Sequence, residues 1–149
     1  MDKPSHLVLC VDDEVVGLSI RRRLLEHGGY RVLTAADGQS GLEIFAANPV
    51  DAVILDYAMP GMDGGQVARQ MRQIKPEVPI LMLSAYVDLP ADVISLIDYR
   101  MTKGEGAIAL LGKLDNLFAR HRIPPVAEKI LLRSDELELS DRRIKRLGD

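Results

Sequence analysis

The sequence predicts an α/β protein with a doubly wound, parallel sheet of five strands in the order 2-1-3-4-5, followed by a short helical extension. Two observations predict this class. Five short apolar segments alternate along the chain with five segments whose composition and spacing favour helices. Apolar residues also make up 47% of the 149 residues, which is enough for one hydrophobic core in about one domain.

The predicted strands are short apolar runs. Residues 7–11, 52–55 and 80–83 are continuously apolar, which is typical of parallel strands that helices cover on both faces. Residues 32–35 and a weaker run at 99–102 complete the set.

The predicted helices lie between and after these strands. The first ends at Gly28-Gly29, because glycine commonly follows the last turn of a helix. Pro90 opens the fourth helix, and the last helix carries apolar residues at helical spacing. The five predicted helices are residues 15–27, 38–47, 65–75, 91–96 and 106–118.

A break at residues 120–125, which end in two prolines, divides the predicted domain, 1–119, from an extension at 120–149. Two short helices in the extension cannot form an independent core, so we expect them to pack on the domain or on a neighbouring chain. Two alternatives stay open: a contact of the basic residues 142–146 with nucleic acid or a partner, and a chain that is part of a longer protein.

Composition excludes several classes of protein. The formal net charge of −3 argues against nucleic-acid or membrane binding driven by a strongly basic surface. The single cysteine, Cys10, cannot form an intramolecular disulfide, and we expect it to be inert in the core. No apolar run is long enough to cross a bilayer, and the N-terminus shows no signal-peptide pattern, so we expect a cytoplasmic protein.

Polar residues stand at the ends of four predicted strands. Asp12-Asp13 follows the first, Asp56 the third, Ser84 the fourth and Lys103 the fifth. The carboxyl ends of parallel strands meet at one edge of the sheet, and ligands of open α/β sheets bind there. Each residue alone has a simpler interpretation; Asp12 or Asp13, for example, would also suit the N-cap of the first helix.

Taken together, these residues predict a phosphoryl-transfer site. Three neighbouring carboxylates repel one another unless a cation is present, and their hard oxygen ligands suit Mg²⁺. A lysine and a serine hydroxyl can hold an anion beside one of them. The carboxylate itself is then the expected nucleophile, forming an aspartyl-phosphate.

Four landmarks in this order resemble the receiver domain of two-component response regulators, of the chemotaxis-regulator type and flavodoxin-like in fold. They are Val-Asp-Asp-Glu at 11–14, the segment 54–64, Leu-Ser-Ala at 83–85 and Thr-Lys at 102–103, and the resemblance covers about residues 5–118.

The resemblance implies a role for each site residue. Asp56 is the phosphoacceptor, Ser84 and Lys103 hold the phosphoryl oxygens, and Asp13 and Asp56 bind Mg²⁺ directly, with the carbonyl of Ala58. Asp12 helps through a water molecule.

The resemblance also implies partners. The donor is a histidine kinase or a histidine phosphotransfer protein, and phosphorylation switches binding to an unknown downstream protein. Homodimer formation stays open. The domain is then a signalling module that catalyses only its own phosphorylation and dephosphorylation, not an enzyme with a separate substrate.

Two alternative functions agree less well with the sequence. A haloacid-dehalogenase-like phosphatase also uses an aspartyl-phosphate, but needs a second carboxylate two residues after the nucleophile, where this chain has Ala58. A flavin- or nucleotide-binding relative needs a phosphate-cradling loop after the first strand, where the run Asp12-Asp13-Glu14 would repel phosphate without a metal.

The chain departs from the family pattern at the fifth strand. Gly104 follows the lysine where the family usually has proline, and Arg100 stands where the family tends to have an aromatic switch residue. Tyr99, one residue earlier, faces the opposite side of the strand. We therefore expect the output to run through the loops after Ser84 and Lys103, with Arg100 pairing with Asp98 or with a partner's carboxylate.

The basic run at residues 21–23 in the first helix is expected to be a solvated helix face. The alternative is a surface that docks an acidic partner helix.

Overall fold

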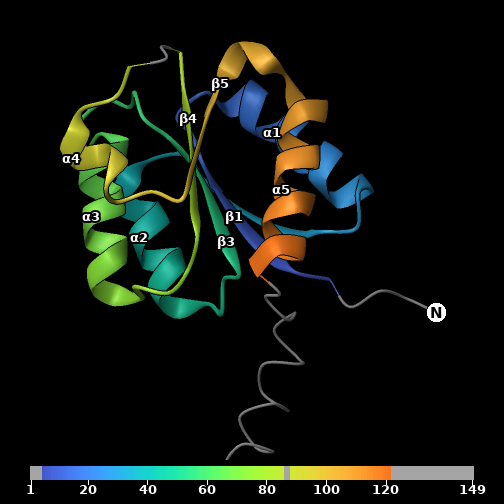
Figure 1. Ribbon diagram of the computed structural model, residues 1–149, viewed down its shortest axis with the longest axis horizontal. Coiled ribbons are helices and arrows are strands. Elements are labelled where there is room, and N and C mark those ends of the chain that lie inside the picture. Colours follow the sequence, from blue (N-terminus) through green and yellow to red (C-terminus); the bar gives the residue numbers. More distant parts are fainter. Residues whose placement is uncertain (1–4, 86–87, 122–149) are drawn as a thin grey trace, which may run out of the picture.

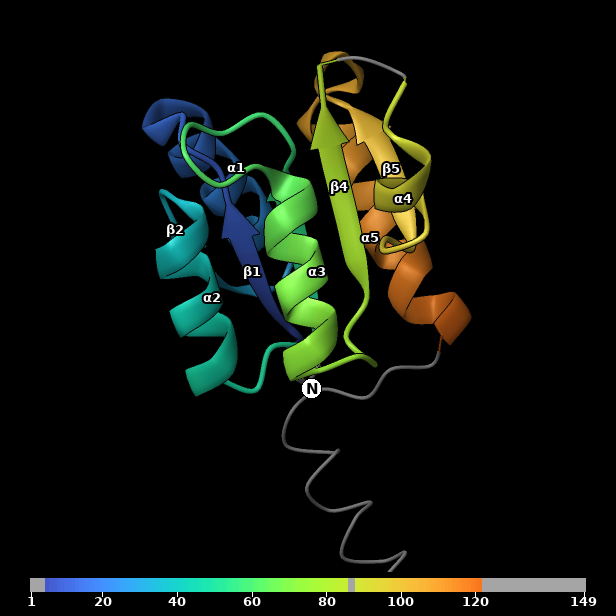
Figure 2. The same cartoon turned by 90° about the vertical axis from the view of Figure 1, so that its left-hand side faces the viewer.

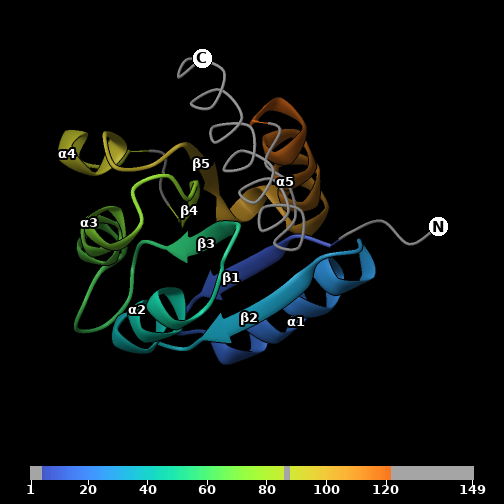
Figure 3. The ribbon, with the colours of Figure 1, turned by 90° about the horizontal axis from the view of Figure 1, so that it is seen from below.

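The computed structural model describes residues 5–85 and 88–121. Its five strands form one parallel sheet in the order β2-β1-β3-β4-β5, which confirms the predicted fold class. Helices cover both faces, with α1 and α5 on one side and α2, α3 and α4 on the other (Figures 1 and 3). The strands are β1 (Leu7–Val11), β2 (Arg31–Ala35), β3 (Ala52–Asp56), β4 (Ile80–Ser84) and β5 (Tyr99–Thr102). The helices are α1 (Val15–His27), α2 (Gly38–Ala47), α3 (Gly64–Ile74), α4 (Ala91–Ile94), η1 (Lys103–Glu105) and α5 (Ala107–His121).

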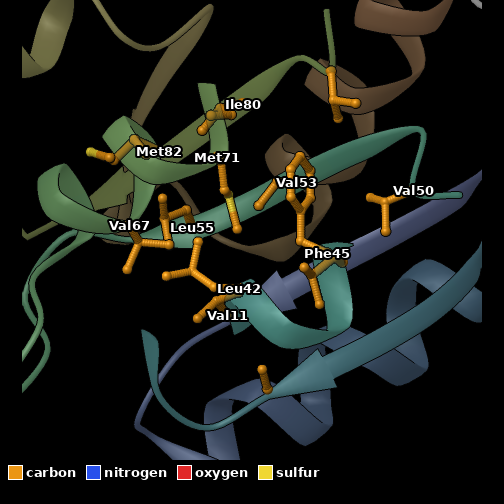
Figure 4. Close-up of a cluster of buried hydrophobic side chains, with 14 of the residues drawn as sticks. Val11, Leu42, Phe45, Val50, Val53, Leu55, Val67, Met71, Ile80 and Met82 are labelled. Carbon is orange, nitrogen blue, oxygen red and sulfur yellow. The ribbon is translucent and has the colours of Figure 1, made fainter. Parts of the chain in front are cut away.

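The sheet separates two hydrophobic cores, and each central strand contributes to both. In β1, Leu7, Leu9 and Val11 pack toward α2 and α3, whereas Val8 and Cys10 pack toward α1 and α5. Figure 2 looks onto the α2 and α3 face, and Figure 4 shows the core beneath it. This two-sided burial is why the central strands are continuously apolar. Burial raises the pKa of Cys10 to about 12, which agrees with an inert thiol.

The first helix has the predicted bounds, 15–27. Gly28 is its C-cap, and Gly29 adopts a φ of 100°, a left-handed conformation that favours glycine. The interpretation of Asp12 or Asp13 as N-cap is wrong, because Glu14 occupies that position; its amide donates to Oδ1 of Asp12 at 2.9 Å.

The last two helices differ from the prediction. The fourth helix ends at Ile94, because the segment after it is held by α3: Nε of Arg72 donates to the carbonyl oxygen of Leu96 at 2.8 Å. The fifth begins at Ala107, after the short helix η1, and runs beyond residue 118 to His121. Residues 120 and 121 of the predicted extension belong to α5, and the rest of it, from 122 onward, lies outside the described residues. Among the described helices, none is long and apolar enough to cross a membrane.

Strand register brings the predicted site residues to one edge. Val11 pairs with Leu55, so Asp12 and Asp56 come next to each other where β1 and β3 end. Ser84 pairs with Thr102, so β4 and β5 end beside them, directly before Lys103. The carboxyl ends of β1, β3, β4 and β5 therefore form a continuous rim.

Candidate functional site

Three carboxylates gather at this rim. One oxygen from each of Asp12, Asp13 and Asp56 lies within 4.8 Å of the others, a spacing that could hold a metal ion. Asp12 and Asp56 are buried, whereas Asp13 is more accessible. Because carboxylate oxygens are hard ligands, the donor set fits Mg²⁺.

The loop after β3 folds tightly against the strand end. The amide of Gly64 donates to the carbonyl oxygen of Tyr57 at 2.8 Å. A Cβ atom at Gly64 would lie 2.5 Å from the backbone oxygen of Asp56, so a larger residue would push the loop away from the site. Asp63 and Gln66 then form a reciprocal capping box that begins α3.

Asp56 is the most constrained of the three carboxylates. Its side chain is 1% exposed, and Nζ of Lys103 lies 3.1 Å from its Oδ1. The other oxygen, Oδ2, is buried and has no hydrogen-bond partner among the described residues. Burial raises the pKa of Asp56 to about 6. The negative charges of Asp12 and Asp13 also raise this pKa, whereas the hydrogen bond and positive charge of Lys103 lower it. A buried carboxylate oxygen without a partner is the feature expected where a cation or a phosphoryl group binds.

Lys103 links the fifth strand to the acidic cluster. Its Nζ also lies 3.6 Å from Oδ2 of Asp12. Burial lowers the pKa of the Lys103 ammonium, but the hydrogen bond to Asp56 and the nearby carboxylates outweigh burial and raise it. Lys103 therefore remains a cation at neutral pH.

The turn that presents Lys103 is ordered without a proline. Residues Lys103–Glu105 form η1, and Glu105 closes a capping box on Thr102, accepting from its amide at 2.9 Å. Gly104 makes the backbone of this turn more costly to order, and the cap formed by Glu105 and Thr102 offsets part of that cost.

Arg21 also reaches the site, which the sequence analysis did not predict. Its Nη1 lies 3.1 Å from Oδ2 of Asp12, with the arginine side chain 14% exposed. The sequence does contain a signal for this position. Leu18, Arg21 and Leu25 share one face of α1 at helical spacing, and both leucines are buried. The expectation of a solvated face holds for Arg22 and Arg23, which are exposed, and is wrong for Arg21.

Two further predicted site residues lie at or just beyond the ends of two neighbouring strands, β4 and β3. Ser84 is buried at the end of β4, and Ala58 is exposed in the loop after β3.

Arg100 is exposed on β5, on the strand face opposite Tyr99, but its expected pairing with Asp98 is wrong. Oδ2 of Asp98 lies 2.5 Å from Nη2 of Arg72 and accepts from the amide of Ile80 at 2.8 Å. Asp98 thus joins α3 to the starts of β4 and β5, and the described residues contain no ion pair of Arg100.

The fold and the acidic cluster at its carboxyl edge define a signalling domain of the kind that the sequence resembled. The family model for the response regulator receiver domain matches residues 8–112, and the chain belongs to this family. It is a receiver domain of two-component signalling systems.

Comparisons with individual proteins agree. The chain is 33% identical over 138 residues to response regulator MprA of Mycobacterium bovis, a match that covers 91% of this chain and 60% of the relative. MprA of Mycobacterium leprae is 33% identical over 135 residues, which covers 89% of this chain and 59% of the relative. The chain thus spans about 60% of the length of these curated relatives.

Solved structures show the same fold. A response regulator receiver domain protein from Clostridium thermocellum has a TM-score of 0.71 and 30% identity, covering 78% of this chain and 97% of that one. Response regulator TrrA of Thermotoga maritima, in complex with Mg²⁺-BeF, has a TM-score of 0.70 and 32% identity. The match covers 75% of this chain and 98% of the TrrA chain.

Proposed function

We propose that this chain is a receiver that accepts a phosphoryl group on Asp56, in a Mg²⁺-dependent step, from a histidine kinase or a histidine phosphotransfer protein. Phosphorylation then switches its binding to a downstream protein. One observation carries the proposal: Asp56 is buried between two other carboxylates and an ammonium 3.1 Å away, and its second oxygen has no hydrogen-bond partner among the described residues.

The chemistry requires one bond to form and one to break. An oxygen of Asp56 attacks the phosphorus of the donor's phosphohistidine, and the P–N bond breaks as the O–P bond forms. Lys103 balances the charge of the phosphoryl oxygens, and the hydroxyl of Ser84 donates to one of them. These roles come from family resemblance and agree with where the residues lie.

Asp13, Asp56 and the carbonyl of Ala58 would hold Mg²⁺, with Asp12 acting through water. When bound, the ion offsets the negative charge of the carboxylates and of the phosphoryl oxygens. The related TrrA structure contains Mg²⁺-BeF, which supports this assignment. Ala58, two residues after Asp56, offers no acid or base, which argues against a phosphatase of the haloacid-dehalogenase type.

The test is labelling by a small phosphodonor. With Mg²⁺, acetyl phosphate should label the protein at about one phosphoryl group per chain, and hydroxylamine should release the label, as expected of an acyl phosphate. Asp56→Asn should abolish labelling, whereas the matched control Asp92→Asn, at an exposed carboxylate, should not change it. Labelling of Asp56→Asn at the wild-type level would overturn the assignment, and steady hydrolysis of generic phosphomonoesters would favour the phosphatase.

A further inference from the structure

Arg21 is a second cation of the acidic site, besides Lys103. We propose that Arg21 is a positioning residue that holds Oδ2 of Asp12 and thereby lowers the affinity of the unphosphorylated site for Mg²⁺. The proposal rests on the proposed function, since it concerns the same metal at the same site.

The contacts of Asp12 carry the first step. Both of its oxygens are engaged: Oδ1 accepts from the amide of Glu14 at 2.9 Å, and Oδ2 lies 3.1 Å from Nη1 of Arg21. Lys103 is farther from Oδ2, at 3.6 Å, and closer to Asp56, at 3.1 Å. Arg21 is therefore the main cationic partner of Asp12, and Lys103 that of Asp56. A metal that draws on Asp12 competes with Arg21.

The charge balance carries the second step. Three carboxylates and two cations leave the site with one excess negative charge. Without Arg21 the excess would be two, and the attraction for a divalent cation would be correspondingly stronger. Phosphorylation replaces the single charge of the Asp56 carboxylate with a phosphoryl group of about −1.5 to −2 charges, a net gain of up to about one negative charge, which offsets the penalty that Arg21 imposes on the metal.

The surroundings of Arg21 allow it to respond. It lines a cavity of about 120 Å³ together with Gly17, Lys103 and Gly106. This space is available to the guanidinium if it moves away from Asp12. The cavity lies beside the site, because Arg21 and Lys103, which contact Asp12 and Asp56, both line it.

The experiment is a Mg²⁺ titration of the unphosphorylated chain by isothermal titration calorimetry. Arg21→Met and Arg21→Gln remove the charge, and Arg21→Lys keeps it. Arg22→Met is the matched control, because Arg22 lies on the same helix, is 52% exposed and pairs with Glu26. The dissociation constant should fall by about tenfold in Arg21→Met and Arg21→Gln, as expected from removing one charge near the metal. It should stay within about twofold of wild type in Arg21→Lys and Arg22→Met, as for a screened surface charge.

A double-mutant cycle tests the route through Asp12. If Arg21 acts by holding Asp12, the effect of Arg21→Met should be clearly smaller in an Asp12→Asn background, where only its through-space effect on the charge of the site remains. Equal Mg²⁺ affinities of Arg21→Met and Arg22→Met would overturn the inference. Weaker Mg²⁺ binding by Arg21→Met and Arg21→Gln than by wild type would also overturn it. Failure of the wild-type chain to bind Mg²⁺ at millimolar concentration would instead overturn the proposed function, so the two failures are distinguishable.

Discussion

The ammonium of Lys103 lies 3.1 Å from Oδ1 of Asp56. Asp56 ends β3 and Lys103 follows β5, so the ion pair passes over the end of β4, the strand between them. A change of charge at Asp56 therefore acts directly on the turn that leads into α5.

The first prediction concerns pH and stability without divalent cations. The pKa of Asp56 rises from an ordinary 3.8 to about 6 in the folded protein, chiefly through burial. Between these values the folded chain binds more protons than the unfolded chain, so stability falls as pH rises through this window, and the loss is complete above about pH 6. Asp56→Asn cannot ionise and should be more stable than wild type at pH 7, by about 1–3 kcal/mol.

Urea unfolding between pH 4 and 7 measures this effect. Wild type should lose stability across the window relative to Asp56→Asn, with the two converging toward pH 4. The exposed variant Asp92→Asn is the control and should stay within about 0.5 kcal/mol of wild type at pH 7. A less stable Asp56→Asn protein at pH 7 would contradict the prediction.

The second prediction concerns the metal. Mg²⁺ should raise the melting temperature by mass action, with a gain of about 1.4 kcal/mol at tenfold excess over the dissociation constant. Asp13→Ala should remove most of this gain, because Asp13 is one of the three clustered carboxylates. Differential scanning calorimetry with and without Mg²⁺ measures the shift. An equal shift in wild type and variant would count decisively against this site.

The third prediction concerns the lifetime of the aspartyl-phosphate. Ala58 is exposed two residues after Asp56, and its methyl group cannot orient a hydrolytic water. We expect the phosphorylated wild-type chain to last for minutes or more, and Ala58→Asn, which adds an amide, to shorten that lifetime. Loss of label is followed after removal of the phosphodonor. Decay of the wild type within seconds would refute the prediction.

The fourth prediction compares two arginines of α3. Arg72 donates to the carbonyl oxygens of Leu96, Pro76 and Val78 and pairs with Asp98. Arg72→Met leaves several of these acceptors without a partner and should cost about 2–3 kcal/mol. Arg69→Met is the matched control: its pair with Asp92 is more than half exposed on both sides, so its loss should cost less than about 1 kcal/mol. Equal losses in urea unfolding would show that Arg72 does not anchor the α4–β5 connection.

The fifth prediction concerns the switch. The exposed Arg100 stands where the family tends to have an aromatic residue, so a charge added at Asp56 is expected to act on the loops after Ser84 and Lys103. Hydrogen exchange with and without beryllofluoride should therefore change mainly in residues 84–106. Changes confined to α1, with residues 84–106 unaltered, would disprove this account.

Local sequence determined where most elements lie and which residues end the strands. Continuous apolar runs such as 7–11 report burial on two faces, and Gly28-Gly29 marks the end of α1, because these signals depend only on neighbouring residues. The same signals placed Asp12, Asp56 and Lys103 at strand ends, and parallel topology then brings them to one edge.

Tertiary structure alone decided which long side chains meet across that edge. Helical spacing places Arg21 on the buried face of α1, but its pairing with Asp12 depends on how α1 lies against the sheet. The pairing of Asp98 with Arg72 likewise depends on the position of α3 beside the start of β5. The length of α4 also depends on Arg72, through its bond to Leu96. An arginine can reach several acceptors at similar cost, so its partner is set by the relative placement of elements distant in sequence, which local periodicity does not encode.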